Sequence, residues 1–325
     1  MSMLSRRKIL ASLGVLVLAS AGTLSTPSRA EYPEKPVEMT VLFGGTANTI
    51  GQLLADLMSK DLHQPVVPVS RTGGGGAIGY THVQSTAPDG YNVVWNSNSI
   101  STAYYQGNMP FNYEAFIPVA RVSTEVPALA VRADSGWKSL QDMVAAVKKS
   151  SDKLKVGISG KGSFTHLTSV ALFNALGIGD RVIYVPYDEG RAPAELLGGR
   201  VDAALQWPGQ FVSHVKAGTI GVLAVTGPER VSVLPDVPTA KEQGANINLT
   251  MWRGLAVPKG TPSEVVAKLE AAAHKATQSK EFQEASDKVG FTPAFLGKDE
   301  FGKLIASDDA TISKLMDELE LKKKK

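Results

Sequence analysis

The strongest constraint on the fold is an alternation of short apolar runs with longer helical patterns. Seven apolar runs predict strands, at residues 37–43, 66–69, 93–96, 155–159, 182–185, 203–206 and 222–226. Segments with helical patterning separate them, for example at 48–62 and near 77–86. Strands that alternate with helices favour parallel sheets covered by helices on both faces. The sequence therefore predicts an α/β fold with parallel-rich sheets.

The first thirty residues have the pattern of a cleavable export signal. Residues 6–8 (Arg-Arg-Lys) are basic, residues 9–22 are apolar, and residues 28–30 (Ser-Arg-Ala) form a small-x-small cleavage site. The apolar run is shorter than the roughly 20 residues that span a bilayer. The paired arginines also approximate a twin-arginine signal, so both Sec and twin-arginine export stay open. We expect a mature chain that starts at Glu31 and works in the periplasm.

The charge of the chain changes when this signal is removed. The full sequence has 34 basic and 31 acidic residues, and four of the basic ones (Arg6, Arg7, Lys8 and Arg29) lie in the signal. The mature chain therefore has 30 basic and 31 acidic residues, a net charge of −1. No basic stripe with interleaved aromatic residues suggests nucleic-acid binding. Since the sequence has no cysteine, disulfides and thiolate metal sites are excluded, and the five histidines lack metal-ligand spacing.

Several fragments occur in an order typical of one protein family. They are Gln-Pro-Val-Val at 64–67, Ala-Pro-Asp-Gly-Tyr at 87–91, Gly-x-Gly-Ser-x-x-His at 160–166, the segment 185–238, and Trp-x-Gly-Leu-Ala-Val-Pro-x-Gly-Thr-Pro at 252–262. Through these fragments the chain after residue 31 resembles the Bug receptors, the TctC-like solute-binding proteins of tripartite tricarboxylate transporters. The resemblance implies a type II-like periplasmic binding protein fold with two lobes and a ligand cleft between them.

The resemblance also implies where the lobes begin and end. Residues 31–127 and 252–325 would form lobe 1, and residues 128–251 would form lobe 2. The two interdomain crossings of the family fall near 127–134 and 249–257. We expect the lobes to close on the ligand about these two segments.

The function that the resemblance implies is binding without chemistry. The receptor would capture a small organic anion, a carboxylate or dicarboxylate that could include an aromatic group. It would deliver this anion to the integral-membrane permease subunits of a tripartite tricarboxylate transporter. We expect a monomer that needs no cofactor and no metal. A sensory protein that signals to a sensor kinase is the alternative.

The ligand is expected beyond the carboxyl ends of the strands, where glycine-rich loops lead into helices. Glycine lets the backbone approach a ligand closely, and helix N-termini present free amides with a partial positive charge. One such loop follows the first strand, one the second strand, and one precedes His166. Polar and indole groups at other strand ends complete the predicted ligand-binding set: Gly44, Gly45, Thr46, Asn48, Gly75, Ser97, Asn98, Gly162, Ser163, Thr165, His166, Tyr187, Gln206 and Trp207.

The chain departs from the family pattern in the first of these loops. The family usually has two further residues before Gly44-Gly45, an Asp where Asn48 stands, and often an Arg in place of Gln52. Without the carboxylate at position 48, a ligand ammonium loses a partner, so amino-acid ligands are disfavoured. The indole of Trp207 either forms a wall for a planar ligand or packs in the core.

Enzymatic interpretations depend on weaker motifs. Gly74-x-Gly76-x-x-Gly79 fits the dinucleotide fingerprint in form, but a run of four glycines satisfies many spacings, and no convincing acidic residue follows. Ser159 lacks the second glycine of a nucleophile elbow. A dinucleotide-dependent or hydrolytic enzyme is therefore the weaker alternative, and no catalytic residue is predicted.

Overall fold

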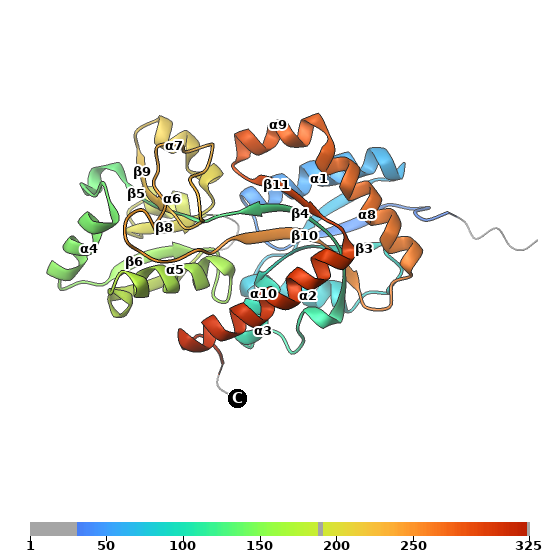
Figure 1. Cartoon of the computed structure of the whole chain (residues 1–325), viewed down its shortest axis with the longest axis horizontal. Coiled ribbons are helices and arrows are strands. Elements are labelled where there is room, and N and C mark those ends of the chain that lie inside the picture. The colour runs from blue at the N-terminus through green and yellow to red at the C-terminus, as the bar shows by residue number, and fades with distance from the viewer. Residues whose placement is uncertain (1–30, 188–190, 324–325) are drawn as a thin grey trace, which may run out of the picture. The chain divides into compact units, whose positions relative to one another are not determined.

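Two β-sheets organise the part of the chain that the computed structural model describes, residues 31–187 and 191–323. The predicted export signal at 1–30 and residues 188–190 of the predicted turn lie outside the described residues. The described residues from Tyr32 onward belong to one compact unit, and Figure 1 shows the arrangement of their helices and strands.

The first sheet has six strands among the described residues. In spatial order they are β11 (Thr292–Leu296), β4 (Phe116–Glu125), β10 (Met251–Pro258), β3 (Asn92–Ser97), β1 (Val37–Val41) and β2 (Val66–Ser70). The strand β1 is parallel to both β2 and β3, whereas β10 is antiparallel to β3 and β4, and β11 to β4.

The second sheet has five strands in the described part of the chain. In spatial order they are β7 (Val182–Pro186), β6 (Leu154–Ile158), β8 (Ala203–Gln206), β5 (Ala128–Arg132) and β9 (Ile220–Val225). The strand β6 is parallel to β7 and β8, and β5 is antiparallel to β8 and β9. The α/β class is confirmed, and parallel pairing occurs where strands alternate with helices. The antiparallel pairs involve strands that the apolar pattern did not predict, except for β3, β8 and β9.

Helices cover both faces of the first sheet. One face packs against α1 (Thr46–Leu62), α8 (Ser263–Gln278) and α9 (Lys280–Val289). The other packs against α2 (Ala77–Gln84), α3 (Ser99–Tyr105) and α10 (Lys298–Glu318). The sequence of α1 shows why this helix packs on the sheet. Its apolar residues recur every fourth position and form one buried stripe of Ile50, Leu54, Met58 and Leu62.

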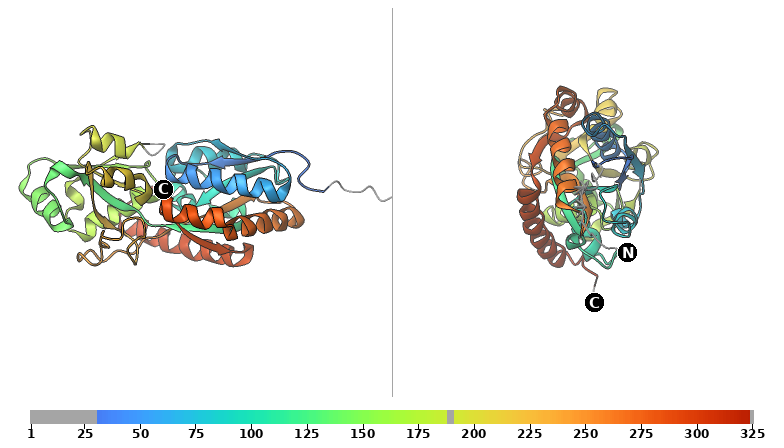
Figure 2. Two further views of the ribbon diagram at one scale, coloured as in Figure 1. Left: turned by 90° about the horizontal axis from the view of Figure 1, so that it is seen from above. Right: turned by 90° about the vertical axis from the view of Figure 1, so that its right-hand side faces the viewer.

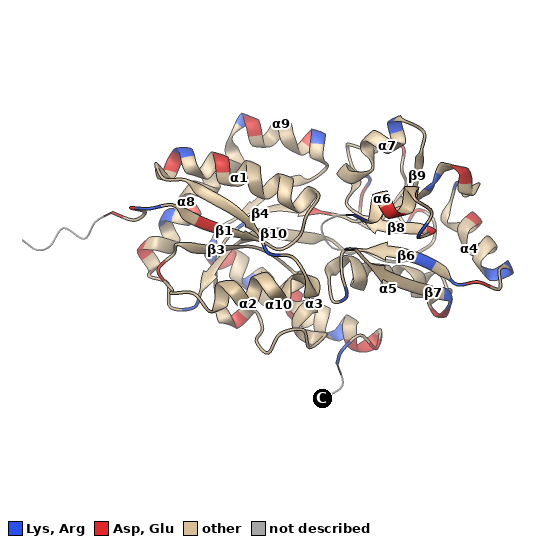
Figure 3. Cartoon of the chain, turned by 180° about the vertical axis from the view of Figure 1, so that it is seen from behind, with Lys and Arg blue, Asp and Glu red and all other residues tan. Residues whose placement is uncertain are grey.

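The second sheet is likewise enclosed by helices. One face packs against α4 (Leu140–Lys149) and α5 (Phe164–Ala175), and the other against α6 (Ala192–Leu197) and α7 (Val212–Lys216). Figure 2 gives two further views of these layers. Charged residues of both signs are scattered over the outer helices, for example α1, α4 and α9 (Figure 3). Within the described residues, no helix combines the length and apolar character needed to cross a membrane.

The chain passes twice between the two sheets. It leaves the first sheet at 126–127, between β4 and β5, and returns through 226–250, between β9 and β10. We call the first sheet with its helices the first half and the second sheet with its helices the second half. Near these passages, Ile312 and Met316 of α10 in the first half pack with Phe164 and Trp207 of the second half. The expected crossings at 127–134 and 249–257 adjoin these passages and lie mostly within β5 and β10.

Candidate ligand-binding site

The N-terminus of α1 is an open set of backbone donors. The chain turns after β1 through Gly45, whose φ of 61° suits glycine, and no side chain caps the helix. The first amides of an α-helix lack intrahelical partners and carry a partial positive charge. The indole Nε1 of Trp95 donates to the Ala47 carbonyl at 3.0 Å and fixes this turn. Thr46 is buried here, whereas the side chain of Asn48 is exposed.

The N-terminus of α5 is capped from within. Ser163 Oγ accepts from the His166 amide at 3.3 Å and lies 3.0 Å from Thr165 Oγ1. Thr165 Oγ1 in turn accepts from the Ser159 amide at 3.0 Å. The Gly162 amide donates to His166 Nδ1 at 3.3 Å. The predicted residues Gly162, Ser163, Thr165 and His166 therefore form one network.

His166 enters this network as a neutral imidazole. Burial lowers its pKa to about 4, and the positive charge of Lys161 acts in the same direction. Because Nδ1 accepts from a backbone amide, we assign the ring proton to Nε2. The ring is thus one more uncharged donor beside the start of α5.

Hydrogen bonds join the loop before α5 to helices and loops that belong to the half of the molecule with the first sheet. Ser99 Oγ accepts from the Phe164 amide at 3.2 Å, and Asn108 Nδ2 donates to both the Gly74 and Lys161 carbonyls at 2.9 and 3.2 Å. Gly75 has a φ of 70°, and a Cβ atom there would lie 2.7 Å from the Lys161 carbonyl oxygen. The structure therefore places Gly75 at a backbone-to-backbone contact between the two halves.

Polar residues at the end of β3 line the same region. Ser97 and Asn98 are buried, and Asn98 Nδ2 donates to the Thr250 carbonyl at 3.2 Å. The Asn98 Oδ1 atom has no hydrogen-bond partner among the described residues. Ser97 is the residue paired with Arg253 of β10 in the sheet register.

The end of β8 supplies Gln206 and Trp207. Ser159 Oγ donates to Gln206 Oε1 at 3.1 Å, while Gln206 Nε2 is buried without a partner in the described part of the chain. Trp207 is 3% exposed and packs in a core cluster with Phe164. The Trp207 ring also makes a cation–π contact with Arg253, whose guanidinium carbon lies 5.0 Å from the ring centroid.

Tyr187 lies beside the β6 end of this region. Its amide donates to the Ile158 carbonyl at 2.8 Å, and its ring lies close to Gly157. The side chain is half-buried. Among the predicted residues, those at the start of α5 are joined by hydrogen bonds, and Gly75 contacts the loop before them, while the side chain of Asn48 is exposed.

Sequence reasoning missed Gln210. This residue ends the short helix η6 (Pro208–Gln210), and its amide Nε2 lies 2.6 Å from the position that a Cβ on Gly45 would occupy. Both terminal atoms are buried and lack partners among the described residues. A free side-chain amide from the segment after β8 thus lies against the open N-terminus of α1. The only signal in the sequence is that Gln210 follows a strand end by a few residues.

The second group missed is a buried ion pair on the strands that lead into the crossings. Arg253 Nε of β10 donates to Glu125 Oε2 of β4, and the two side chains are 1% and 0% exposed. Burial raises the pKa of Glu125 above its usual range, and the Arg253 charge opposes that rise. Glu125 Oε1 and Arg253 Nη2 have no partner in the described residues.

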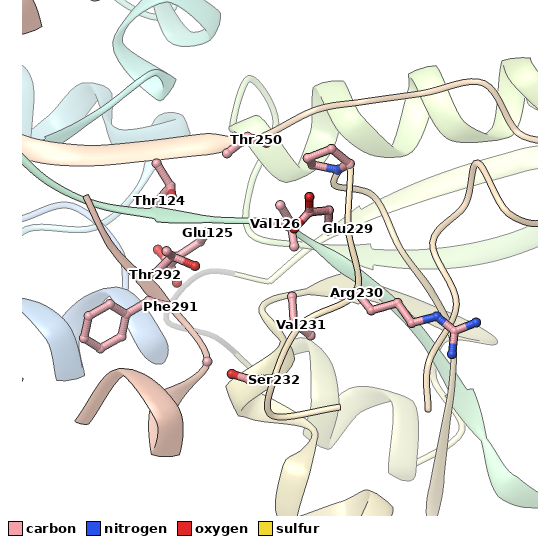
Figure 4. Close-up of a pocket in the computed structure, with 12 residues that line it drawn as sticks. Thr124, Glu125, Val126, Glu229, Arg230, Val231, Ser232, Thr250, Phe291 and Thr292 are labelled. Atoms are coloured by element: carbon pink, nitrogen blue, oxygen red, sulfur yellow. The ribbon is translucent and has the colours of Figure 1, made fainter. Parts of the chain in front are cut away.

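A cavity of about 290 Å³ is lined in part by Glu125 (Figure 4). It is lined by residues of β4, the returning segment and β11, among them Glu125, Glu229 and Arg230. The Arg230 guanidinium pairs with Glu242 at 3.1 Å, and its side chain points away from Glu125 in Figure 4. Two carboxylates and a paired arginine make this cavity unsuited to an anion. In the described residues no cluster of three or more His, Asp or Glu side chains could hold a metal.

Two β-sheets are each covered by helices, the chain passes twice between them, and buried polar loops lie near these passages. This is the architecture of a periplasmic binding protein. The periplasmic binding protein BugD has this fold, with a TM-score of 0.83 and 30% identity, over 90% of this chain and all of its own. Over residues 50–321 the chain matches the family described as tripartite tricarboxylate transporter family receptor, TctC. The chain belongs to this family of solute-binding proteins, as the sequence fragments predicted.

Two further similarities agree with this assignment. A UPF0065 protein of Agrobacterium vitis is 34% identical over 289 residues, which cover 86% of this chain and 82% of that protein. MatC from Rhodopseudomonas palustris, solved with bound malate, is 26% identical with a TM-score of 0.80, over 87% of this chain and 99% of its own.

Proposed function

We propose that this protein is an exported receptor that binds a small carboxylate between its two halves and hands it unchanged to membrane permease subunits. The observation that carries the proposal is the uncapped N-terminus of α1, against which the unpartnered amide of Gln210 lies. Uncharged donors around a helix N-terminus stabilise a carboxylate without the desolvation cost of burying an unpaired lysine.

The predicted site residues have distinct roles in this proposal. Gly44, Gly45 and Thr46 present backbone amides to the carboxylate, and Asn48 borders it. Ser163, Thr165 and His166 shape the opposite wall, since their hydrogen bonds fix the start of α5. The bound malate of MatC supports a carboxylate as the ligand class.

Transport needs closure and a membrane partner. We propose that residues 31–127 with 252–325 and residues 128–251 act as two lobes that close about the two crossings. The ligand would select the closed arrangement from an open–closed equilibrium. Export by the predicted signal, a monomeric state and delivery to permease subunits of the tripartite tricarboxylate type complete the proposal.

Isothermal titration calorimetry against a panel of mono- and dicarboxylates tests the binding function. We expect at least one carboxylate to bind and to be recovered unchanged by mass spectrometry. Small-angle scattering at saturating ligand should then give a smaller radius of gyration. Turnover of a carboxylate by the wild type would contradict a receptor, and an unchanged radius with proven binding would contradict closure.

A further inference from the structure

The helix α10 contacts both halves of the molecule. Its first turns pack on the first sheet, where Phe301 and Ile305 join a core cluster made of residues of the first half. Two turns further on, Ile312 and Met316 pack with Phe164, which begins α5 of the second half (Figure 1). One continuous helix thus links the halves, in addition to the two passages of the chain.

Directional contacts hold the middle of α10 to the first half. Asp308 Oδ2 accepts from Trp252 Nε1 of β10 at 2.8 Å, and Asp309 Oδ2 accepts from the Tyr105 hydroxyl of α3 at 2.8 Å. The Trp252 ring also lies edge-on to Phe301, with 5.0 Å between the ring centroids. These contacts fix the helix on the first half up to residue 309.

The contact between the end of α10 and the second half is apolar. Leu319, at the C-cap, packs against the core cluster of the second half, and Met316 packs with Leu167 of α5. Apolar packing has no preferred direction, and a methionine side chain adapts easily to a shifted neighbour. Because no proline interrupts α10, we do not expect it to kink and keep both contacts. When the halves move apart, the apolar contact should therefore give way first.

The tail after α10 supports the loop before α5. The Leu321 carbonyl accepts from Gln106 Nε2 at 2.9 Å, and the Lys323 amide donates to the Tyr105 carbonyl at 2.9 Å. Gln106 in turn lies against Gly162, where an added Cβ atom would be 3.1 Å from Gln106 Cγ. The tail thus acts, through Gln106, on a loop that carries predicted ligand residues.

We propose that residues 312–323 form a strap that holds the second half in the arrangement that completes the ligand site. The strap acts in the ligand-free protein, and its effect on affinity rests on the proposed function. A contact that is made only in the closed arrangement raises the closed fraction, and the apparent dissociation constant falls in proportion. The strap therefore sets how much of the empty receptor is ready to bind.

Two leucine-to-alanine substitutions at the two ends of α10 test the strap. Leu319→Ala removes a half-buried side chain that packs on the core of the second half. The control Leu304→Ala removes a half-buried side chain that packs on the core of the first half.

Spin labels report the arrangement of the halves without any ligand. Since the chain has no cysteine, Val67→Cys and Ile183→Cys create two unique labelling sites. These side chains are 43% and 45% exposed and lie on the edge strands β2 and β7, away from the connecting strands β4, β5 and β10. Double electron–electron resonance then measures the distance between the two labels.

We expect Leu319→Ala to shift the label distances of the ligand-free protein to larger values, and Leu304→Ala to match the labelled parent. Calorimetry with malate and adipate should find roughly 3- to 10-fold weaker binding in Leu319→Ala, since a half-buried leucine contributes about half as much as a fully buried one. Leu304→Ala should keep the affinity. Leu319→Met conserves the side-chain volume and should restore both readouts.

The outcomes separate the strap from the proposed function. Unchanged label distances in Leu319→Ala would overturn the strap, and so would equal shifts in Leu319→Ala and Leu304→Ala. If no carboxylate binds the wild type, the proposed function fails, while the label distances still decide the strap. Should Leu319→Ala not fold, the milder Leu319→Val takes its place in the distance measurement.

Discussion

Replacing Gly75 by alanine should block the contact between the two halves while leaving each half intact. The new Cβ atom would lie 2.7 Å from the Lys161 carbonyl oxygen and 2.9 Å from the Gly162 carbonyl carbon. Both are backbone atoms, so neither can turn aside as a flexible side chain would. Overpacking of this kind costs about 1–3 kcal/mol, which corresponds to roughly 5- to 150-fold in dissociation constant.

The positive φ of Gly75 adds a second cost that must be separated from the first. Alanine at a φ of 70° is strained by about 1–2 kcal/mol whether or not the halves meet. Gly136 provides the matched control, because its φ is 77° and no heavy atom lies within 4 Å of the added Cβ. Gly136→Ala should lose similar stability and keep wild-type affinity.

Calorimetry with a dicarboxylate and thermal unfolding of both variants form the assay. We expect the melting temperature of Gly75→Ala to fall at least as far as that of Gly136→Ala, and only Gly75→Ala to bind more weakly. Small-angle scattering of Gly75→Ala with ligand should give a larger radius of gyration than the liganded wild type. If Gly75→Ala binds as tightly as Gly136→Ala, the contact at Lys161 is not part of the bound state, and the reasoning is refuted.

Three further substitutions, two of them with a matched control, test the region around the site. Because burial lowers the pKa of His166 to about 4, roughly 3 kcal/mol of folding stability should be lost as the pH falls from 6.5 towards 4. Denaturant unfolding should therefore depend less on pH in His166→Asn than in the wild type, and the control His63→Asn, at an exposed position, should behave like the wild type. Ser163→Ala and Ser139→Ala each remove an N-cap worth about 1 kcal/mol, and calorimetry should find weaker binding in Ser163→Ala alone. Asn48→Asp should raise helix stability slightly and weaken carboxylate binding, and unchanged affinity would place the anion elsewhere.

The sequence predicted seven strands from short segments rich in apolar residues. The strand β1 was found because the apolar residues at 37, 39 and 41–43 precede a glycine turn, and β8 because residues 203–205 form an apolar run. The strand β4 was missed because Pro118, Arg121 and Glu125 interrupt its apolar pattern. Their compatibility with a central strand depends on neighbours that only the folded chain provides.

The same limit applies to the binding site. The glycine loops before α1 and α5 could be predicted because short motifs carry them. The ion pair of Glu125 and Arg253 could not, since the two residues are 128 positions apart and charged strand residues usually face water. Gln210 stood in no motif, and its importance comes from lying against Gly45 across the two halves.

The uncapped N-terminus of α1 has a consequence for the stability of the ligand-free protein and for its proteolysis. A side-chain cap there would add about 1 kcal/mol to the stability of the empty protein, and the chain does without it. In the proposed function a bound carboxylate would serve as that cap, so the ligand would complete the helix. Any ligand at a hundred times its dissociation constant stabilises the folded state by about 2.7 kcal/mol. An empty receptor should therefore be cut by proteases faster than a loaded one, and its survival would report how much cargo the surroundings hold.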